Sequence, residues 1–220
     1  MAFIMRDLQF TQSDHAIFNI ADITLHDHEW LCIEGGNGSG KSTIASIIAG
    51  WVPTLLPGEI SGKLTLNDSC ILECSVIELS SKIQYVQQAP QWQLSGCAFT
   101  VEEELTFGPE NLAMDNAIIL SQLEKTLELM DLTHLRKRDP STLSGGEMQR
   151  LMIGSALMMQ PELLILDESF SRMTLAYQTK ILERLKALNS KQPMNIIILE
   201  KRKSEFMAFC EQLLTLPKRG

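Results

Sequence analysis

The sequence predicts an α/β fold with a mainly parallel sheet at its core, an N-terminal antiparallel β subdomain and an inserted α-helical subdomain. Two observations lead to this fold class. Short apolar segments alternate with helical patterns in the first and last thirds of the chain, which is typical of a parallel sheet buried on both faces. Between about residues 90 and 160, apolar residues recur at helical spacing instead.

The elements are expected in a regular order along the chain. Strands are predicted where apolar and polar residues alternate or where a compact apolar run occurs, and helices where apolar residues recur every three or four positions. The predicted strands span residues 3–10, 17–25, 30–34, 60–66, 163–166, 195–199 and 212–216. The predicted helices span residues 42–49, 102–107, 116–130, 147–159 and 175–188.

The 220 residues show no internal repeat and no linker, so one domain is expected. Residues 1–89 and 160–220 would form the core with its β subdomain, and residues 90–159 the helical subdomain. A net charge of -8 argues against a nucleic-acid partner, because binding phosphate backbones needs clustered basic residues. No apolar run approaches the roughly 20 residues that cross a bilayer, and the N-terminus lacks a signal-peptide pattern. The protein is expected in the cytosol, with membrane contact only through a partner.

The clearest motif is GGNGSGKST, which lies between a predicted strand and a predicted helix. It fits the P-loop pattern, in which glycines let backbone N–H groups turn inward around phosphates at a helix N-terminus. Lys41 is expected to reach the β- and γ-phosphates, and the Ser42 hydroxyl to ligate Mg²⁺. The fold class is therefore refined to a P-loop NTPase (RecA-like) core. The residues expected to bind nucleotide are Gly35, Gly36, Asn37, Gly38, Ser39, Gly40, Lys41, Ser42 and Thr43.

A second motif, LLILDE, is an apolar strand that ends in two carboxylates. In open α/β folds, ligands bind at the carboxyl edge of the sheet, where such a strand would deliver both acids. Asp167 is expected to hold Mg²⁺, as a Walker-B aspartate does, and Glu168 to orient or deprotonate the attacking water. An isolated strand ending in two acids is weak evidence, but after a P-loop it becomes strong.

The third motif, LSGGEMQR, opens a predicted helix, and here the chain resembles the ABC ATPase family. The family signature LSGGQ is matched except that Glu147 replaces the glutamine. The resemblance implies a head-to-tail dimer in which the signature of one subunit contacts ATP bound by the other. The expected signature residues are Leu143, Ser144, Gly145, Gly146 and Glu147. An ordinary helix N-cap is the alternative interpretation of Ser144, and both roles are compatible.

Gln88 resembles the family's Q-loop glutamine, which joins the Mg²⁺ shell, although Gln87 leaves the register uncertain by one residue. The candidate catalytic residues are thus Glu168, Lys41 and Gln88, and the candidate metal ligands are Ser42, Gln88 and Asp167. ATP and Mg²⁺ are the expected cofactors.

The segment QQAPQWQLSGCAFTVEEELTFGPEN, residues 87–111, is similar to the ATPase subunits of energy-coupling factor (ECF) transporters, which import vitamins and transition-metal ions. That resemblance implies a peripheral subunit on the cytoplasmic face of the membrane. Its partners would be a second, identical or non-identical ATPase subunit, a transmembrane scaffold and a substrate-binding membrane subunit.

Three departures from the family pattern concern the P-loop side of the site. The aromatic residue that usually stacks on adenine falls at Gln12, with Phe10 as a possible substitute. Thr174 stands where the D-loop has aspartate, and Lys201 where the switch histidine is expected. We therefore expect a secure ATP site with uncertain hydrolysis, in a transport ATPase that pairs with a second subunit. The alternatives are a degenerate nucleotide-binding partner without turnover and a soluble ABC ATPase that acts outside transport.

Overall fold

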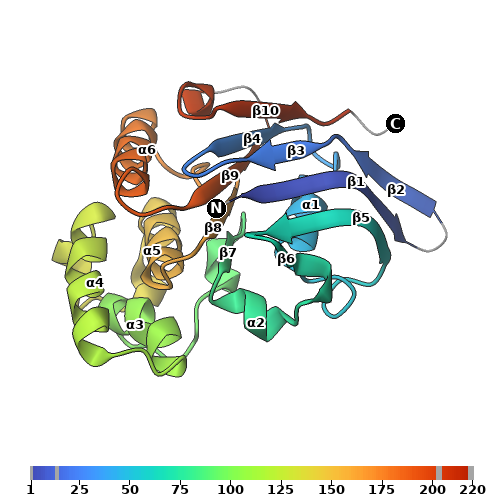
Figure 1. Ribbon diagram of the computed structural model, residues 1–220. Helices are drawn as coiled ribbons and strands as arrows, with labels where there is room; N and C mark the ends of the chain where they lie inside the picture. Colours follow the sequence, from blue (N-terminus) through green and yellow to red (C-terminus); the bar gives the residue numbers. More distant parts are fainter. Residues whose placement is uncertain (1, 13–14, 202–204, 218–220) are drawn as a thin grey trace.

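A computed structural model of the chain describes residues 2–12, 15–201 and 205–217 and contains two five-stranded sheets flanked by helices (Figure 1). The first sheet has the order β10 (Gln212–Thr215), β4 (Trp30–Glu34), β9 (Asn195–Glu200), β8 (Leu163–Asp167) and β7 (Ile83–Val86). All its neighbouring strands are parallel. The runs WLCIE, LLILD and NIIILE are almost wholly buried, as expected for strands covered on both faces.

The second sheet is antiparallel and consists of β1 (Phe3–Gln12), β2 (His15–Ile20), β3 (Ile23–Leu25), β5 (Glu59–Leu66) and β6 (Ser69–Cys70). The single strand predicted at residues 17–25 is wrong, because β2 and β3 are separate strands. The chain leaves the sheet at Ala21 and Asp22, and the Asp22 carboxylate accepts a hydrogen bond from the backbone N–H of Asp7 at 2.9 Å. A side-chain hydrogen bond to the interior of β1 thus joins the break between β2 and β3 to the sheet.

The two faces of the parallel sheet carry different cores. Alternate residues such as Ile33, Ile165 and Ile197 face the antiparallel sheet and α1 (Lys41–Ile48). The intervening residues, such as Leu164 and Ile198, face α5 (Gly145–Met158) and α6 (Leu175–Asn189). The strands β4, β8 and β9, with their carboxyl ends, therefore lie between the hydrophobic cores on the two faces of the sheet.

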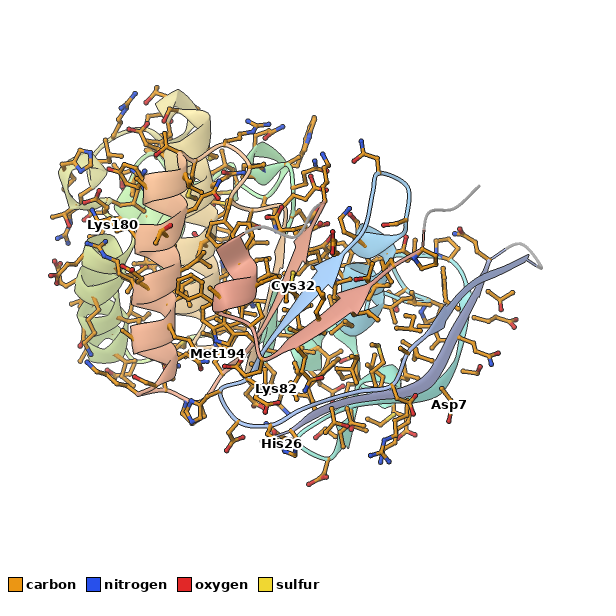
Figure 2. All side chains as sticks on the ribbon, turned by 90° about the horizontal axis from the view of Figure 1, so that it is seen from above. Asp7, His26, Cys32, Lys82, Lys180 and Met194 are labelled. Carbon is orange, nitrogen blue, oxygen red and sulfur yellow. The ribbon has the colours of Figure 1, made fainter. Side chains whose placement is uncertain are left out.

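The helical subdomain contains α3 (Val101–Asn111), α4 (Asn116–Leu129) and α5, and lies on the opposite side of the molecule from the antiparallel sheet (Figure 1). In Figure 2, Lys180 of α6 lies on the helical side and Asp7 at the far end of the antiparallel sheet. The prediction ended the first of these helices at residue 107, but α3 continues through Gly108 and Pro109. Thr100 and Glu103 form a capping box at its start.

The sequence did not predict α2 (Val76–Ser80), the short strand β6 or β7. Otherwise the α/β fold class agrees with the prediction, including the antiparallel sheet and the helical insertion. Among the residues described, none of the helices combines the length and apolarity that crossing a membrane requires.

Candidate nucleotide-binding site

The loop between β4 and α1 is shaped by its glycines. Gly38 and Gly40 have φ values of +76° and +94°, a region that side-chain-bearing residues seldom adopt. A Cβ on Gly35 would lie 2.3 Å from the Ser39 hydroxyl, so this turn accepts only glycine there. The backbone N–H of Gly35 donates to the carbonyl of Glu200 at 3.1 Å, which ties the loop to the end of β9.

The loop opens onto a cavity of about 400 Å³. Its walls are formed by Asn37, Gly38, Gly40, Lys41, Ser42, Thr43, Gln88, Glu168 and Lys201. Segments far apart in the sequence therefore meet at one place, the carboxyl edge of the parallel sheet. This is the position at which α/β folds bind ligands.

Lys41 is buried at the floor of this cavity. Its Nζ donates to the carbonyl oxygens of Gly35 at 2.7 Å and Gly36 at 3.3 Å, and forms an ion pair with Glu168 Oε1 at 3.3 Å. The lysine is thus held along its own loop with its charge directed into the cavity. The Ser39 hydroxyl is buried and has no hydrogen-bond partner among the described residues.

Asp167 ends β8 and is only 2% exposed. The hydroxyl of Tyr85 on β7 donates to its Oδ2 at 2.9 Å. Burial raises the pKa of Asp167, and hydrogen bonds from Ser42 and Tyr85 oppose that rise. The structure thus brings Ser42 and Asp167, both predicted metal ligands, into contact. Tyr85 was missed because β7 itself was not predicted.

Glu168 is the point at which the polar contacts of the site converge. Its backbone lies at φ +48° and its N–H donates to the Leu199 carbonyl at 2.9 Å, so the residue leaves β8 in a sharp turn. Lys41 contacts one carboxylate oxygen, while Gln88 Nε2 at 2.7 Å and Lys201 Nζ at 2.9 Å contact the other.

The side chain that reaches Glu168 belongs to Gln88. The neighbouring Gln87 uses its backbone N–H to donate to Gln93 Oε1 at 2.7 Å, and its side chain does not line the cavity. Of the two glutamines, Gln88 is thus the one that lines the cavity, and its role as the Q-loop residue stays a prediction.

The last residue of β9 is acidic, Glu200, and the next residue is basic, Lys201. Burial, reinforced by the negative charges of Glu168 and Asp167, raises the pKa of Glu200 to about 7. Lys201 is exposed, and its hydrogen bond to Glu168 raises its pKa. The residue at the expected histidine position therefore contacts the candidate catalytic carboxylate directly.

These residues fit MgATP in most respects. Glycine N–H groups, the unpartnered Ser39 hydroxyl and Lys41 suit phosphate oxygens, while Ser42, Asp167 and Gln88 offer the oxygen ligands that Mg²⁺ prefers. An adenine platform is not provided by Phe10. It is 1% exposed, and its ring packs so closely on Gly58 that a Cβ there would lie 2.2 Å from Cε2. The proposed substitution of Phe10 for the missing aromatic is therefore wrong.

The signature residues surround a separate cavity of about 490 Å³ at the start of α5. Ser144 caps the helix: its N–H donates to Glu147 Oε2 at 2.7 Å and its hydroxyl accepts from the Glu147 N–H at 3.4 Å. Both glycines have close neighbours: a Cβ on Gly145 would lie 2.7 Å from Arg172 Cδ, and one on Gly146 would lie 3.1 Å from the Arg172 carbonyl oxygen. Leu143 is half-buried and packs against the helical core. The signature and P-loop cavities have no lining residue in common, so one chain alone does not bring these motifs together.

A P-loop ATPase core is defined by β4, the glycine loop and α1, together with Asp167 and Glu168 at the end of β8. The chain belongs to the ABC transporter family: the family model described as "ABC transporter" matches residues 18–171. An ABC transporter ATP-binding protein of Pyrococcus horikoshii is 32% identical over 216 residues, which cover 97% of this chain and 75% of the relative. Two such proteins of Methanosarcina mazei are each 32% identical, but the chain spans only 35% and 36% of their length.

Two solved structures share the fold. One is cbiO1 from Clostridium perfringens, described as part of the ABC transporter complex cbiONQ, with a TM-score of 0.83, 24% identity and coverage of 97% of this chain and 84% of that one. The other is an ATP-binding cassette of an ABC transporter in its ADP conformation, with a TM-score of 0.79, 24% identity and coverage of 98% and 87%.

Proposed function

We propose that the chain binds and hydrolyses MgATP and thereby powers solute transport through a separate membrane partner. The observation that carries this proposal is the convergence of Lys41, Gln88 and Lys201 on Glu168, at the rim of a glycine loop built for phosphate. Membership in the ABC transporter family supports both ATP use and coupling to transport.

Each residue of the site has a distinct task in this proposal. The loop N–H groups and the N-terminus of α1 bind the β- and γ-phosphates, and Lys41 neutralises their charge. Ser42, Asp167 and Gln88 hold Mg²⁺, which supplies further charge neutralisation when bound. Glu168 accepts the proton of, or orients, the attacking water, and its contact with Gln88 keeps the carboxylate directed at the cavity.

A second ATPase subunit would complete the site. Because the signature cavity lies apart from the chain's own loop, Ser144, Gly145 and Gly146 are available to a nucleotide bound by a partner in a head-to-tail pair. The exposed Leu175, at the start of α6 beside the signature cavity, is consistent with a contact surface there.

A membrane partner would dock near the segment that carries Gln88. A groove of about 270 Å³ lies between β7 and the helices α3 and α5, with Tyr85, Gln93, Phe107 and Met152 among its lining residues. Trp92 and Phe99, in the same segment, are both 81% exposed, which is unusual for large apolar side chains. Movement of this segment would be transmitted to Glu168 through Gln88.

Within transport, ECF-type import of a vitamin or metal ion is the proposed role. It rests on the resemblance of residues 87–111, and the fold similarity to cbiO1, part of the complex cbiONQ, supports it. The subunit would then sit peripherally on the cytoplasmic face of the membrane. The alternatives are a degenerate partner subunit without turnover, favoured by Lys201 at the histidine position, and a soluble ABC ATPase acting outside transport.

Binding of MgATP to the isolated chain, measured by titration calorimetry, tests the first part of the proposal. Lys41→Met should abolish binding, Glu168→Gln should preserve it, and the exposed Lys191→Met serves as a matched control. Binding that is unaffected by Lys41→Met would contradict the assigned site.

Turnover of the assembly purified from gently solubilised membranes tests the second part. If Glu168→Gln abolishes all turnover while Ser144→Arg leaves it intact, pairing through the signature is refuted. The proteins that co-purify identify the membrane partner, and loss of co-purification on changing Trp92 and Phe99 to Ser would support the proposed docking surface. If the chain stays soluble when native membranes are pelleted, the non-transport alternative is favoured.

A further inference from the structure

The lining of the signature cavity contains more basic than acidic side chains. Arg150 and Arg172 both line it, and the N-terminus of α5 adds its partial positive charge. Glu147 is the acidic residue of the lining, but its carboxylate already accepts the Ser144 N–H and lies 3.9 Å from Arg138. In a chain of net charge -8, this concentration of cations indicates an anionic ligand.

Arg150 provides independent evidence for such a ligand. It is only 7% exposed, yet its Nε has no hydrogen-bond partner among the described residues. The guanidinium carbon lies 4.8 Å from the ring centroid of Tyr177, a residue of the same cavity wall. The buried guanidinium therefore places a positive charge in the cavity wall, which favours an anion in the cavity without a contact to the inaccessible Nε.

Arg172 occupies the outer rim of the cavity. Its side chain runs along Gly145: a Cβ on that glycine would lie 2.7 Å from Arg172 Cδ and 3.4 Å from Nη1. Its backbone is fixed, since its N–H donates to Gln149 Oε1 at 3.0 Å and Gln149 Nε2 donates to Ser171 Oγ at 3.1 Å. No ion pair of Arg172 is found within the described part of the chain, so its guanidinium is available beside the first N–H groups of α5.

We propose that Arg172, backed by Arg150, binds the terminal phosphate of the nucleotide held in the P-loop of a second ATPase subunit. The inference rests on the proposed head-to-tail pairing and adds to it a phosphate-binding residue outside the signature motif. A guanidinium offers a planar pair of N–H donors that matches phosphate oxygens, and an arginine supplied from a neighbouring subunit stabilises charge that builds up during phosphoryl transfer. The signature glycines keep this position open, because any side chain at residue 145 would displace Arg172.

The test compares the wild-type assembly from solubilised membranes with assemblies that carry Arg172→Ala, Arg172→Lys or the control Arg6→Ala on the distant antiparallel sheet. ATP turnover and the amount of ADP retained with vanadate are measured for each assembly, and MgATP affinity is measured separately for each isolated chain. We expect Arg172→Ala to lower kcat about 10- to 100-fold and to lose vanadate-dependent retention. Arg172→Lys should recover part of both, and Arg6→Ala should change neither.

The affinity of the isolated chain for MgATP should be the same with and without Arg172, because the residue does not line the chain's own P-loop cavity. Wild-type turnover and retention in the alanine variant would overturn the proposal, as would weaker MgATP binding by that isolated chain. If the alanine variant does not assemble, full activity of the lysine variant overturns the proposal, since a point charge does not reproduce paired donors. A wild-type chain that binds no MgATP would instead refute the assigned P-loop function.

Discussion

The hydroxyl of Tyr85 is expected to stabilise the fold through the buried Asp167, and Tyr85→Phe removes that hydroxyl alone. Its hydrogen bond to Oδ2 is 2.9 Å long, and the carboxylate is almost fully buried. Hydrogen bonds to charged groups contribute about 1.5–3 kcal/mol, and Ser42 shares part of this task, so we expect a loss near 2 kcal/mol. For a protein of 220 residues this corresponds to a fall in Tm of about 4–8 °C.

The effect should depend on pH through the charge of Asp167. Burial raises the pKa of Asp167 above its unfolded value, and burial together with the Asp167 charge raises the pKa of Tyr85, which therefore stays a donor. The hydroxyl stabilises the ionised carboxylate more strongly than the neutral acid. Its contribution is therefore largest above the folded pKa of Asp167 and decreases as the pH falls through that value. Removal of the hydroxyl raises the pKa of Asp167 further.

Denaturant unfolding of the wild type, Tyr85→Phe, Asp167→Asn and the double variant at pH 8 and at a series of lower pH values measures this coupling. We expect a coupling free energy of about 1–2 kcal/mol at pH 8 and a smaller value as the pH falls through the folded pKa of Asp167. Coupling below about 0.3 kcal/mol at pH 8, or a value that does not change over this series, would refute the reasoning. Tryptophan fluorescence from Trp51 reports the site directly, since its ring centroid lies 5.1 Å from that of Tyr85.

Three further predictions concern other parts of the chain. Gly58→Ala should lower the free energy of unfolding by about 1–3 kcal/mol, because φ is +155° and a Cβ would lie 2.2 Å from Phe10. An unchanged denaturant midpoint would contradict the geometry. Glu102→Gln should cost about 1 kcal/mol or less at pH 7, because hydrogen bonds from Lys137 and a neighbouring arginine lower the pKa of Glu102. This cost, measured by denaturant unfolding, should shrink as the pH falls through the folded pKa of Glu102. Lys201→His should raise ATP turnover at the chain's own P-loop, since an imidazole can both donate and accept hydrogen bonds. Equal turnover by the assemblies that contain the wild-type and the variant chain would exclude a role for residue 201.

Local signals explain why much of the fold was predictable. The apolar runs of β4, β8 and β9 are continuous because both faces of these strands are buried, and the Gly-Lys-Ser spacing marks a loop whose conformation depends on its own glycines. In contrast, β7 has four residues, two of them only half-buried, and its identity depends on pairing with β8, some 80 residues away. A pattern read within a short window does not contain that pairing.

The candidate site was likewise predictable where it depends on contiguous residues and not where it depends on contacts between distant strands. The P-loop, the acids of β8 and the signature were identified from contiguous residues, and the functional roles assigned to them remain predictions. Tyr85 and the contact between Lys201 and Glu168 depend on strands that become neighbours only in the folded chain. The burial of Phe10 could not be predicted from the sequence either, because it results from the packing of β1 on Gly58 rather than from the residues around position 10.

The two phosphate-facing surfaces of the chain differ in their charge balance. At the P-loop, Lys41 and Lys201 both contact Glu168, and Asp167 and Glu200 lie beside it, so the basic charge is already engaged by acidic groups. A phosphate that enters there must compete with Glu168 for Lys201 or depend on Mg²⁺ and the loop N–H groups. At the signature cavity, the guanidinium groups of Arg150 and Arg172 form no ion pair within the described residues. This difference in charge balance supports the proposal that the chain pairs with a non-identical ATPase whose loop carries most of the turnover.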